Sequence, residues 1–210
     1  MKRNYQHETD AVTSSLGGAR PSLLLQCCCG PCSSYVLEYL TKYFDVTVLY
    51  YNPNIQPAEE YDKRLFYMRQ IASKYPETVS VMECGYRGED FDAVARGLES
   101  EPEGGARCSK CFELRLRETA RLAKEGTFDY FCTTLSVSPH KDEQRLNEIG
   151  FELEHELGVK WLPSDFKKRE GYKRSIELAR EYGLYRQDYC GCLFSLAELQ
   201  NTMSQTAPDK

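Results

Sequence analysis

The sequence predicts a single α/β domain built on a mostly parallel sheet. From Leu23 onward, short apolar runs alternate with longer amphipathic stretches, and strands that alternate with helices form parallel sheets covered on both faces. The 210 residues are 41% hydrophobic, which is enough for one compact core. We expect this domain at 23–200, between a flexible N-terminal extension at 1–22 and a C-terminal tail at 201–210.

Three strands and three helices are expected in the first half of the domain. Each strand is a short apolar run, and the second is terminated by Asn52, Pro53 and Asn54. Each helix repeats apolar residues at helical spacing. The strands are expected at 23–25, 46–51 and 78–82, and the helices at 36–44, 58–74 and 91–98.

The second half continues the alternation after a loop at 99–105 that is rich in Glu and Gly. The first helix after this loop consists largely of strong helix formers. Helices are expected at 108–124, 142–157 and 171–182, and strands at 130–135 and 159–162. This order predicts a Rossmann-like sheet flanked by helices.

Composition and charge indicate a cytoplasmic protein. The net charge is −5, the mean hydropathy is −0.58, and no apolar run reaches fifteen residues, so no membrane span is expected. The first 22 residues carry scattered charges and no apolar core, unlike a signal peptide.

The ten cysteines carry the strongest functional signal. Eight of them fall into three clusters, and in a reducing compartment such clusters indicate metal binding or thiol redox chemistry. The isolated Cys84 and Cys132 are expected to be buried structural thiols. The clusters are Cys27, Cys28, Cys29 and Cys32; Cys108 and Cys111; and Cys190 and Cys192.

The first cluster lies where the first strand should lead into the first helix. Ligands bind at this carboxyl end of the strands in open α/β sheets. The positive end of the helix dipole there lowers thiol pKa values and favours metal ligation. We therefore expect a metal site at the carboxyl end of the first strand.

Cys108 and Cys111 form a CxxC at the start of a helix. Their spacing places both sulfurs on one helical face. Alone, the pair is compatible with a redox dithiol, half a zinc site or half an iron–sulfur site. Together with two N-terminal cysteines it would give a four-thiolate site for zinc or a 4Fe-4S cluster, and the adjacent Cys28 and Cys29 favour the cluster.

The third cluster, Cys190-Gly191-Cys192, has the spacing of a small, strained disulfide. Strained disulfides are easily reduced, so a redox-active pair is favoured over two further metal ligands.

Basic residues gather at 107–121 and 167–174 despite the negative net charge. Local positive patches can hold phosphates, and the 15 tyrosines offer stacking surfaces for unpaired bases. These features permit RNA binding without predicting it. His140 follows the end of an expected strand, where it could line a site, although an ordinary loop position is favoured.

Five segments taken together resemble one known family. They are Leu-Leu-Leu-Gln-Cys-Cys-Cys-Gly-Pro-Cys-Ser (23–33), Tyr-Asn-Pro-Asn-Ile-Gln-Pro-x-x-Glu-Tyr (51–61), Ala-Arg-Cys-x-x-Cys-Phe-x-x-Arg-Leu (106–116), Thr-Thr-Leu-x-x-Ser-Pro (133–139) and Tyr-Arg-Gln-x-Tyr-Cys-Gly-Cys-x-x-Ser (185–195). In this order they resemble the cobalamin-independent epoxyqueuosine reductases, the QueH family.

The resemblance implies an oxidoreductase that reduces epoxyqueuosine to queuosine in the tRNA anticodon loop, the last step of queuosine synthesis. It also implies a 4Fe-4S cluster with a further iron beside it. On this chain Cys28, Cys29, Cys108 and Cys111 would bind the cluster, and Cys190 and Cys192 would form the redox-active pair. The family commonly has His at the position of Gln26, and Cys27 lies outside its motif.

Removing the epoxide oxygen as water requires two electrons, proton donors and an acid that binds oxygen. We expect Cys32, with Asp165 or Asp188, to bind the further iron. Lys110 or Tyr189 would donate a proton. An unidentified electron donor would complete the cycle.

Two other functions remain as alternatives. A tRNA sulfur-transfer enzyme would need an ATP-pyrophosphatase loop rich in Gly and Ser after the first strand, where this chain has cysteines. A zinc-stabilised nucleic-acid-binding module would leave Cys190 and Cys192 without a role.

Overall fold

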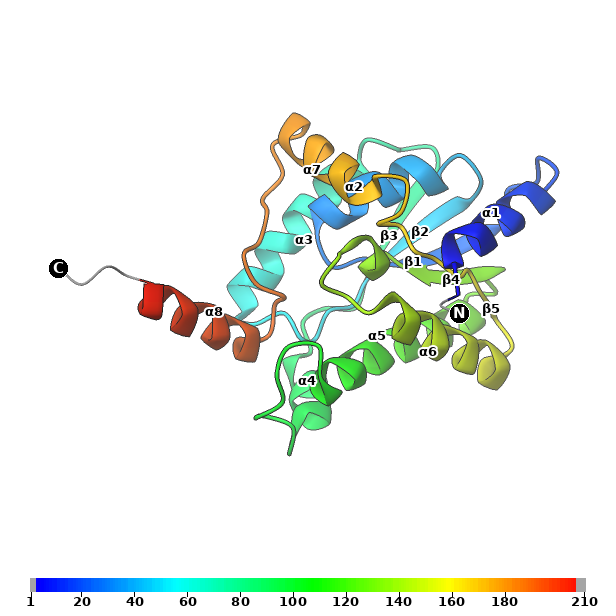
Figure 1. Cartoon of the computed structure of the whole chain (residues 1–210). Helices are drawn as coiled ribbons and strands as arrows, with labels where there is room; N and C mark the ends of the chain where they lie inside the picture. The colour runs from blue at the N-terminus through cyan, green and yellow to red at the C-terminus, as the bar shows by residue number, and fades with distance from the viewer. Residues whose placement is uncertain (1–2, 207–210) are drawn as a thin grey trace.

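A computed structural model describes residues 3–206 and contains one five-stranded, all-parallel sheet within them (Figure 1). The strand order is β3-β2-β1-β4-β5, which places β1 at the centre. The predicted α/β fold with a parallel sheet is therefore confirmed. The strands are β1 (Ser22–Gln26), β2 (Asp45–Tyr50), β3 (Val79–Glu83), β4 (Tyr130–Thr133) and β5 (Lys160–Trp161).

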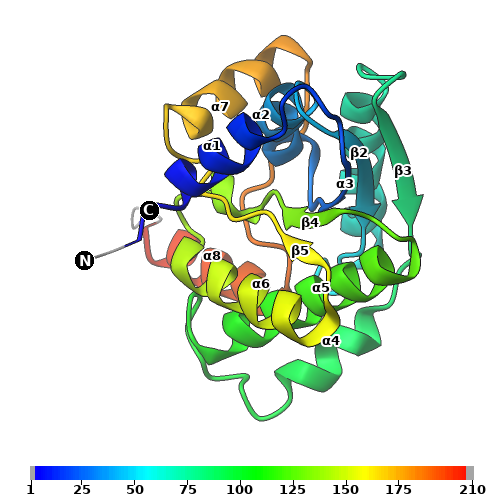
Figure 2. The ribbon, with the colours of Figure 1, turned by 90° about the vertical axis from the view of Figure 1, so that its right-hand side faces the viewer.

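Helices cover both faces of this sheet (Figure 2). The α2 and α3 helices pack on one face, and α5 and α6 pack on the other. The helices are α1 (Tyr5–Ser15), α2 (Gly30–Leu40), α3 (Ala58–Ala72), α4 (Gly88–Ala95), α5 (Ala106–Glu125), α6 (Glu143–Leu157), α7 (Gly171–Glu181) and α8 (Leu193–Thr206), with a short 3-10 turn η1 (Leu135–Val137).

The central strand β1 supplies both hydrophobic cores. Leu23 and Leu25 belong to the core under α2 and α3, whereas Leu24 belongs to the core under α5 and α6. Successive side chains of a strand point to opposite faces, and all three leucines are fully buried. This alternation continues past the end of the strand, because Cys27 lies in the first core and Cys28 packs against the second.

The carboxyl ends of β1, β2 and β4 meet at one edge of the sheet. β1 pairs with both neighbours in parallel, so that Gln26 lies opposite Leu49 and Thr133. A buried polar network joins the loops at this edge: the Gln26 amide donates to Asn52 Oδ1 at 3.0 Å and accepts from Thr133 Oγ1 at 2.9 Å. Gln26 thus holds together the three connections that surround the candidate site.

The expected loose extension at 1–22 contains a packed helix instead. In α1, Tyr5 and Thr9 are buried, and the Thr9 hydroxyl donates to the Pro163 carbonyl at 2.7 Å. The helix is mostly polar, so the apolar pattern did not reveal it. It can nevertheless be buried because backbone carbonyls satisfy its hydroxyl groups.

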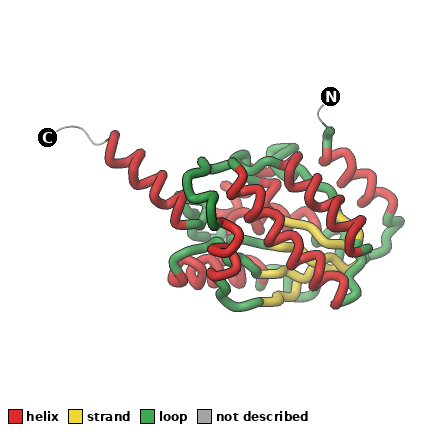
Figure 3. The backbone as a smooth tube through the Cα atoms, turned by 90° about the horizontal axis from the view of Figure 1, so that it is seen from below, coloured by secondary structure: helices red, strands yellow, loops and turns green. Residues whose placement is uncertain are grey.

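The segment expected to be a C-terminal tail starts inside α8, which continues from the domain and projects away from its body (Figure 3). Residues 207–210 of that predicted tail lie outside the described residues. None of the helices in residues 3–206 combines the length and apolarity that a bilayer crossing requires.

The start of α2 depends on a close approach to α3. A Cβ atom on Gly30 would lie 2.8 Å from the backbone oxygen of Tyr67. Because a helix backbone cannot yield as a flexible side chain can, we expect Gly30→Ala to lower the free energy of unfolding by about 1–3 kcal/mol, measured by anaerobic urea denaturation.

Gly88→Ala is the matched control, since Gly88 is also the first residue of a helix. Its added Cβ would meet the hydroxyl end of the Tyr86 side chain, which is 40% exposed and can move. A change within about 0.5 kcal/mol is expected. Equal losses for the two variants would contradict the packing argument.

Candidate metal and thiol site

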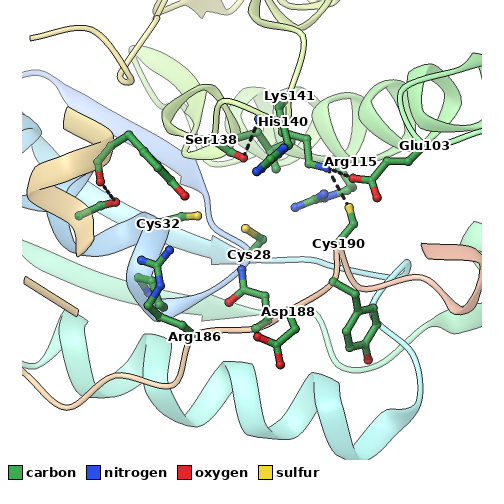
Figure 4. Close-up of a pocket in the computed structure, with 16 residues that line it drawn as sticks. Cys28, Cys32, Glu103, Arg115, Ser138, His140, Lys141, Arg186, Asp188 and Cys190 are labelled. Atoms are coloured by element: carbon green, nitrogen blue, oxygen red, sulfur yellow. Dashed lines mark hydrogen bonds and ion pairs between the residues drawn. The ribbon is translucent and has the colours of Figure 1, made fainter. Parts of the chain in front are cut away.

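A pocket of about 350 Å³ lies at the carboxyl edge of the sheet. It is lined by the start of α2, by α5, by the segment after β4, by α7 and by residues 186–190. Cys28, Cys32 and Cys190 face this space together (Figure 4). The pocket therefore joins cysteines that are more than 150 positions apart in the chain.

Cys28, Cys29 and Cys32 form a compact group of thiols. Their sulfurs all lie within 4.8 Å of one another, a spacing at which they could hold a metal ion. The Gln187 amide donates to Cys29 Sγ at 3.2 Å. Hydrogen bonds from Cys29 and Cys32, helped by the charge of Arg115, hold the pKa of Cys28 well below its ordinary value, so one thiolate is stabilised within the group.

Cys27 has a different environment although it precedes Cys28 directly. Its side chain is fully buried in the core under α2, and burial raises its pKa. The structure therefore gives Cys27 a packing role.

Cys108 and Cys111 occupy the first turns of α5, as the sequence predicted. The Gly104 backbone N–H donates to Cys108 Sγ at 3.2 Å. Burial raises the pKa of Cys111 to about 12, and nearby Arg115 opposes that rise. Neither sulfur belongs to the compact group of Cys28, Cys29 and Cys32, so the predicted four-thiolate set divides into two pairs with Arg115 close to both.

Arg115 is a buried cation at the centre of the site. It is 2% exposed and donates to Asn52 Oδ1 at 2.8 Å and to Gln26 Oε1 at 3.3 Å. Its Nε has no hydrogen-bond partner, and no carboxylate among residues 3–206 pairs with it. A buried charge is costly unless it is paired, so Arg115 would stabilise an anion bound at this site.

The nearby cysteines lie within electrostatic range of this charge. Although burial opposes the charge of Arg115, Cys111, Cys28 and Cys190 together raise its pKa. Figure 4 shows the guanidinium directed into the space between Cys28 and Cys190. Arg115 therefore lies within electrostatic range of one or more residues of each cysteine cluster.

The segment that carries Cys190 and Cys192 is anchored by a second buried arginine. Arg64 pairs with Glu60 at 2.7 Å and donates to the Cys190 carbonyl at 3.0 Å. Gly191 has a φ of +136°, which favours glycine between the two cysteines. The loop is therefore held in one conformation.

The two cysteines of this segment face different surroundings. Cys190 lines the pocket, whereas Cys192 is 7% exposed and packs in one cluster with Cys111 and Phe91. Both thiols are free in the structure, as are the other eight cysteines.

Of the expected proton donors and iron ligands, some line the pocket and others lie outside it. Lys110 pairs with Glu113 at 3.1 Å and its side chain is 57% exposed, so it points away from the pocket. Asp165 pairs with Lys167 at 2.8 Å and does not line the pocket, whereas Asp188 does. Tyr189 also lines the pocket, but its hydroxyl donates to the Gln56 carbonyl at 2.7 Å.

Sequence reasoning missed three residues at the site. Arg115 was grouped only with a basic patch, a loop position was favoured for His140 over a place in a site, and Lys141 was not selected; all three line the pocket. Arg115 lies one helical turn after Cys111, and this spacing was the available signal. Nothing in the local sequence distinguishes Lys141 from a surface lysine.

Comparison with known proteins gives consistent matches. The family model described as epoxyqueuosine reductase QueH matches residues 23–198. The epoxyqueuosine reductase QueH of Streptococcus pyogenes serotype M1 is 47% identical over 84% of this chain and 71% of its own length. That of Staphylococcus epidermidis is 44% identical over 93% of this chain and 85% of its own length, and that of Thermotoga maritima is 34% identical over 84% and 91%.

A solved structure shares the fold at low sequence identity. It is the U34-tRNA thiolase NcsA from Methanococcus maripaludis with its [4Fe-4S] cluster, at 15% identity and a TM-score of 0.54, covering 97% of this chain and 74% of that chain. The family match and the curated relatives agree over nearly the whole domain. The chain belongs to the epoxyqueuosine reductase QueH family.

Proposed function

We propose that this chain reduces epoxyqueuosine to queuosine in the anticodon of tRNA. Family membership supports this oxidoreductase activity. The observation that carries the proposal is one pocket lined by Cys28, Cys32, Cys190 and Arg115, in which Arg115 is buried and has no carboxylate partner among residues 3–206.

The cofactor proposed for this pocket is a 4Fe-4S cluster held by Cys28, Cys29, Cys108 and Cys111. The unpartnered Nε of Arg115 fits such a group, because a cluster with four thiolate ligands is anionic and a buried guanidinium would stabilise it. Cys32, within 4.8 Å of Cys28 and Cys29, is the ligand proposed for a further iron, with Asp188 at the pocket wall. When bound, the cluster would carry electrons and an iron with an open position would act as a Lewis acid.

Cys190 and Cys192 are the proposed redox pair. Loss of the epoxide oxygen consumes two electrons and two protons and yields an alkene and water. Conversion of two thiols to one disulfide releases two electrons and two protons, so the two half-reactions balance. An external electron donor must then reduce the disulfide before the next turnover.

The tRNA substrate would present its modified base from a single-stranded loop. Bases in such loops can be turned out and bound in a pocket. Ser138, His140, Arg186 and Asp188 line this pocket and provide donors and acceptors for hydrogen bonds to the base.

The redox role is tested with Cys190→Ser. Serine cannot form a disulfide, so we expect the iron and sulfide content to remain at the wild-type level while reduction falls at least about 100-fold. The measurement is anaerobic incubation with tRNA carrying epoxyqueuosine, followed by mass spectrometry of its nucleosides. Cys84→Ser, at a half-buried thiol outside the pocket, should remain active, and full activity of Cys190→Ser would refute the redox role.

The cluster ligands are tested with two adjacent cysteines. Cys28→Ala should reduce the iron and sulfide bound per chain to less than about half, because a cluster ligand is lost. The Cys27→Ala variant should retain the wild-type content of iron and sulfide. Its free energy of unfolding should fall by only about 1 kcal/mol, since the Cys27 side chain packs in the core. Iron and acid-labile sulfide are measured after anaerobic purification, and equal losses in both variants would contradict the assignment.

A further inference from the structure

The segment that follows α7 joins the outer face of α3 to the pocket. It runs along α3 (Figure 1), where the Gln70 amide donates to the Tyr182 carbonyl at 2.9 Å. The centroids of the Tyr67 and Tyr185 rings lie 5.9 Å apart, and the next residue, Arg186, lines the pocket (Figure 4). Side chains of α3 and of this segment therefore form one surface that reaches the pocket.

Phe66 extends the ring contacts of this surface into solvent. Its ring packs edge-to-face on Tyr67, with the centroids 5.2 Å apart, yet Phe66 is 61% exposed. The other phenylalanines among residues 3–206 are buried or half-buried, as is usual for large apolar side chains. An exposed aromatic ring on a surface that reaches a pocket offers a base a face on which to stack.

The cations of this surface have no carboxylate partner. The Nζ atom of Lys63 lies 3.4 Å from the centroid of the Tyr185 ring, and that of Lys74 lies 5.1 Å from the centroid of Tyr182. Within residues 3–206, neither lysine forms an ion pair with a carboxylate, and Arg186 forms none either. These positive charges therefore remain available to phosphate groups.

The basic groups noticed in the sequence are compensated to a greater extent. The acid beside Tyr185, Glu60, is also neutralised, because it pairs with Arg64 at 2.7 Å. An ion pair reduces the net charge that a phosphate can meet. The basic residues at 167–174 and on α5 that pair with carboxylates are Lys167, Arg169, Lys173, Arg174, Lys110, Arg117 and Arg121.

We propose that this surface binds the unpaired nucleotides next to the modified base of the tRNA. We call it the α3 rim and define it by Lys63, Phe66, Tyr67, Lys74, Tyr182, Tyr185 and Arg186. The inference rests on the proposed function and places the anticodon loop across α3 while the modified base enters the pocket. Aromatic faces combined with unpaired cations are the chemistry that binds single-stranded nucleic acid.

The members of the α3 rim have separate roles in this binding. The exposed Phe66 ring stacks on a base, and Tyr67 holds that ring in place from behind. Lys63 and Arg186 contact phosphates on the side of the pocket, so the strand is directed toward it. Stacking does not depend on base identity, because every base has an aromatic face.

Three substitutions separate stacking from charge. Phe66→Ala removes the ring, Phe66→Tyr keeps an aromatic face, and Lys63→Gln removes one cation. Lys124→Gln is the matched control, because Lys124 is an exposed lysine without a carboxylate partner in residues 3–206 and lies on α5, which covers the opposite face of the sheet. Iron and sulfide content equal to that of the wild type shows that each variant is folded.

The first readout is binding without reaction. Anaerobic holoprotein is titrated with tRNA carrying queuosine, the product, at a series of salt concentrations. The Kd of Phe66→Ala should rise about fivefold or more, because one stacked base is lost, and Phe66→Tyr should bind like the wild type. In Lys63→Gln the slope of log Kd against log salt should fall by about one, as for loss of one phosphate contact, whereas Lys124→Gln should match the wild type.

The second readout is reduction of tRNA carrying epoxyqueuosine. Phe66→Ala should raise KM about as much as it raises Kd and leave kcat close to the wild-type value, because Phe66 lies outside the pocket. Unchanged Kd and KM in Phe66→Ala would overturn the proposal, as would equal losses of affinity in Lys63→Gln and Lys124→Gln.

A third result would assign the α3 rim to another partner. Wild-type Kd for tRNA combined with slower multiple turnover in Phe66→Ala would indicate that the rim binds the electron donor, and this would also overturn the proposal. Failure of the wild type to reduce epoxyqueuosine would refute the proposed function, whereas the α3 rim is judged separately by the Kd values for tRNA.

Discussion

The site depends on one buried charge that has no carboxylate partner among residues 3–206, the guanidinium of Arg115. Its hydrogen bonds to Asn52 and Gln26 are neutral, so they fix its direction without cancelling its charge. An arginine buried without an anionic partner is destabilising, and Cys28, Cys111 and Cys190 are the neighbours whose thiolate forms would offset its charge. This cation at the carboxyl edge of the sheet links the other features of the site. It is hydrogen-bonded to the buried polar network and lies close to the cysteine clusters, and it would stabilise the anionic cofactor proposed for them.

The two cysteines of the 189–192 segment, the proposed redox pair, have different surroundings. Arg64 holds the backbone of residues 189–190 against α3. Cys190 faces the pocket at the carboxyl edge of the sheet, and Cys192 packs with Cys111, a proposed cluster ligand. The proposed redox pair would therefore connect the pocket, where the epoxide would be reduced, with the thiols proposed to hold the cluster. The same geometry explains why a glycine with positive φ separates the two cysteines.

Much of the fold could be predicted from the sequence, because apolar alternation and helical spacing are local signals. The strand of leucines at 23–25 and the helix after Cys108 both appear as expected. The same two-residue alternation could have separated Cys27 from Cys28, since it continues beyond β1. Arg115 and Lys141 could not be identified in this way, because their importance comes from segments that meet only in three dimensions. The α1 helix was missed because buried hydroxyl groups, satisfied by backbone carbonyls, replace most of its apolar pattern. Gln26, where the family commonly has His, serves the buried network rather than the pocket wall.

The most direct test of the account is the content of iron, zinc and acid-labile sulfide per chain after strictly anaerobic purification. The account predicts about four or more irons with a matching amount of sulfide, because the buried Arg115 and the surrounding thiols would stabilise the proposed anionic cluster. Stoichiometric zinc without sulfide would contradict it. That result would remove the electron carrier and indicate a zinc-stabilised module in place of a reductase.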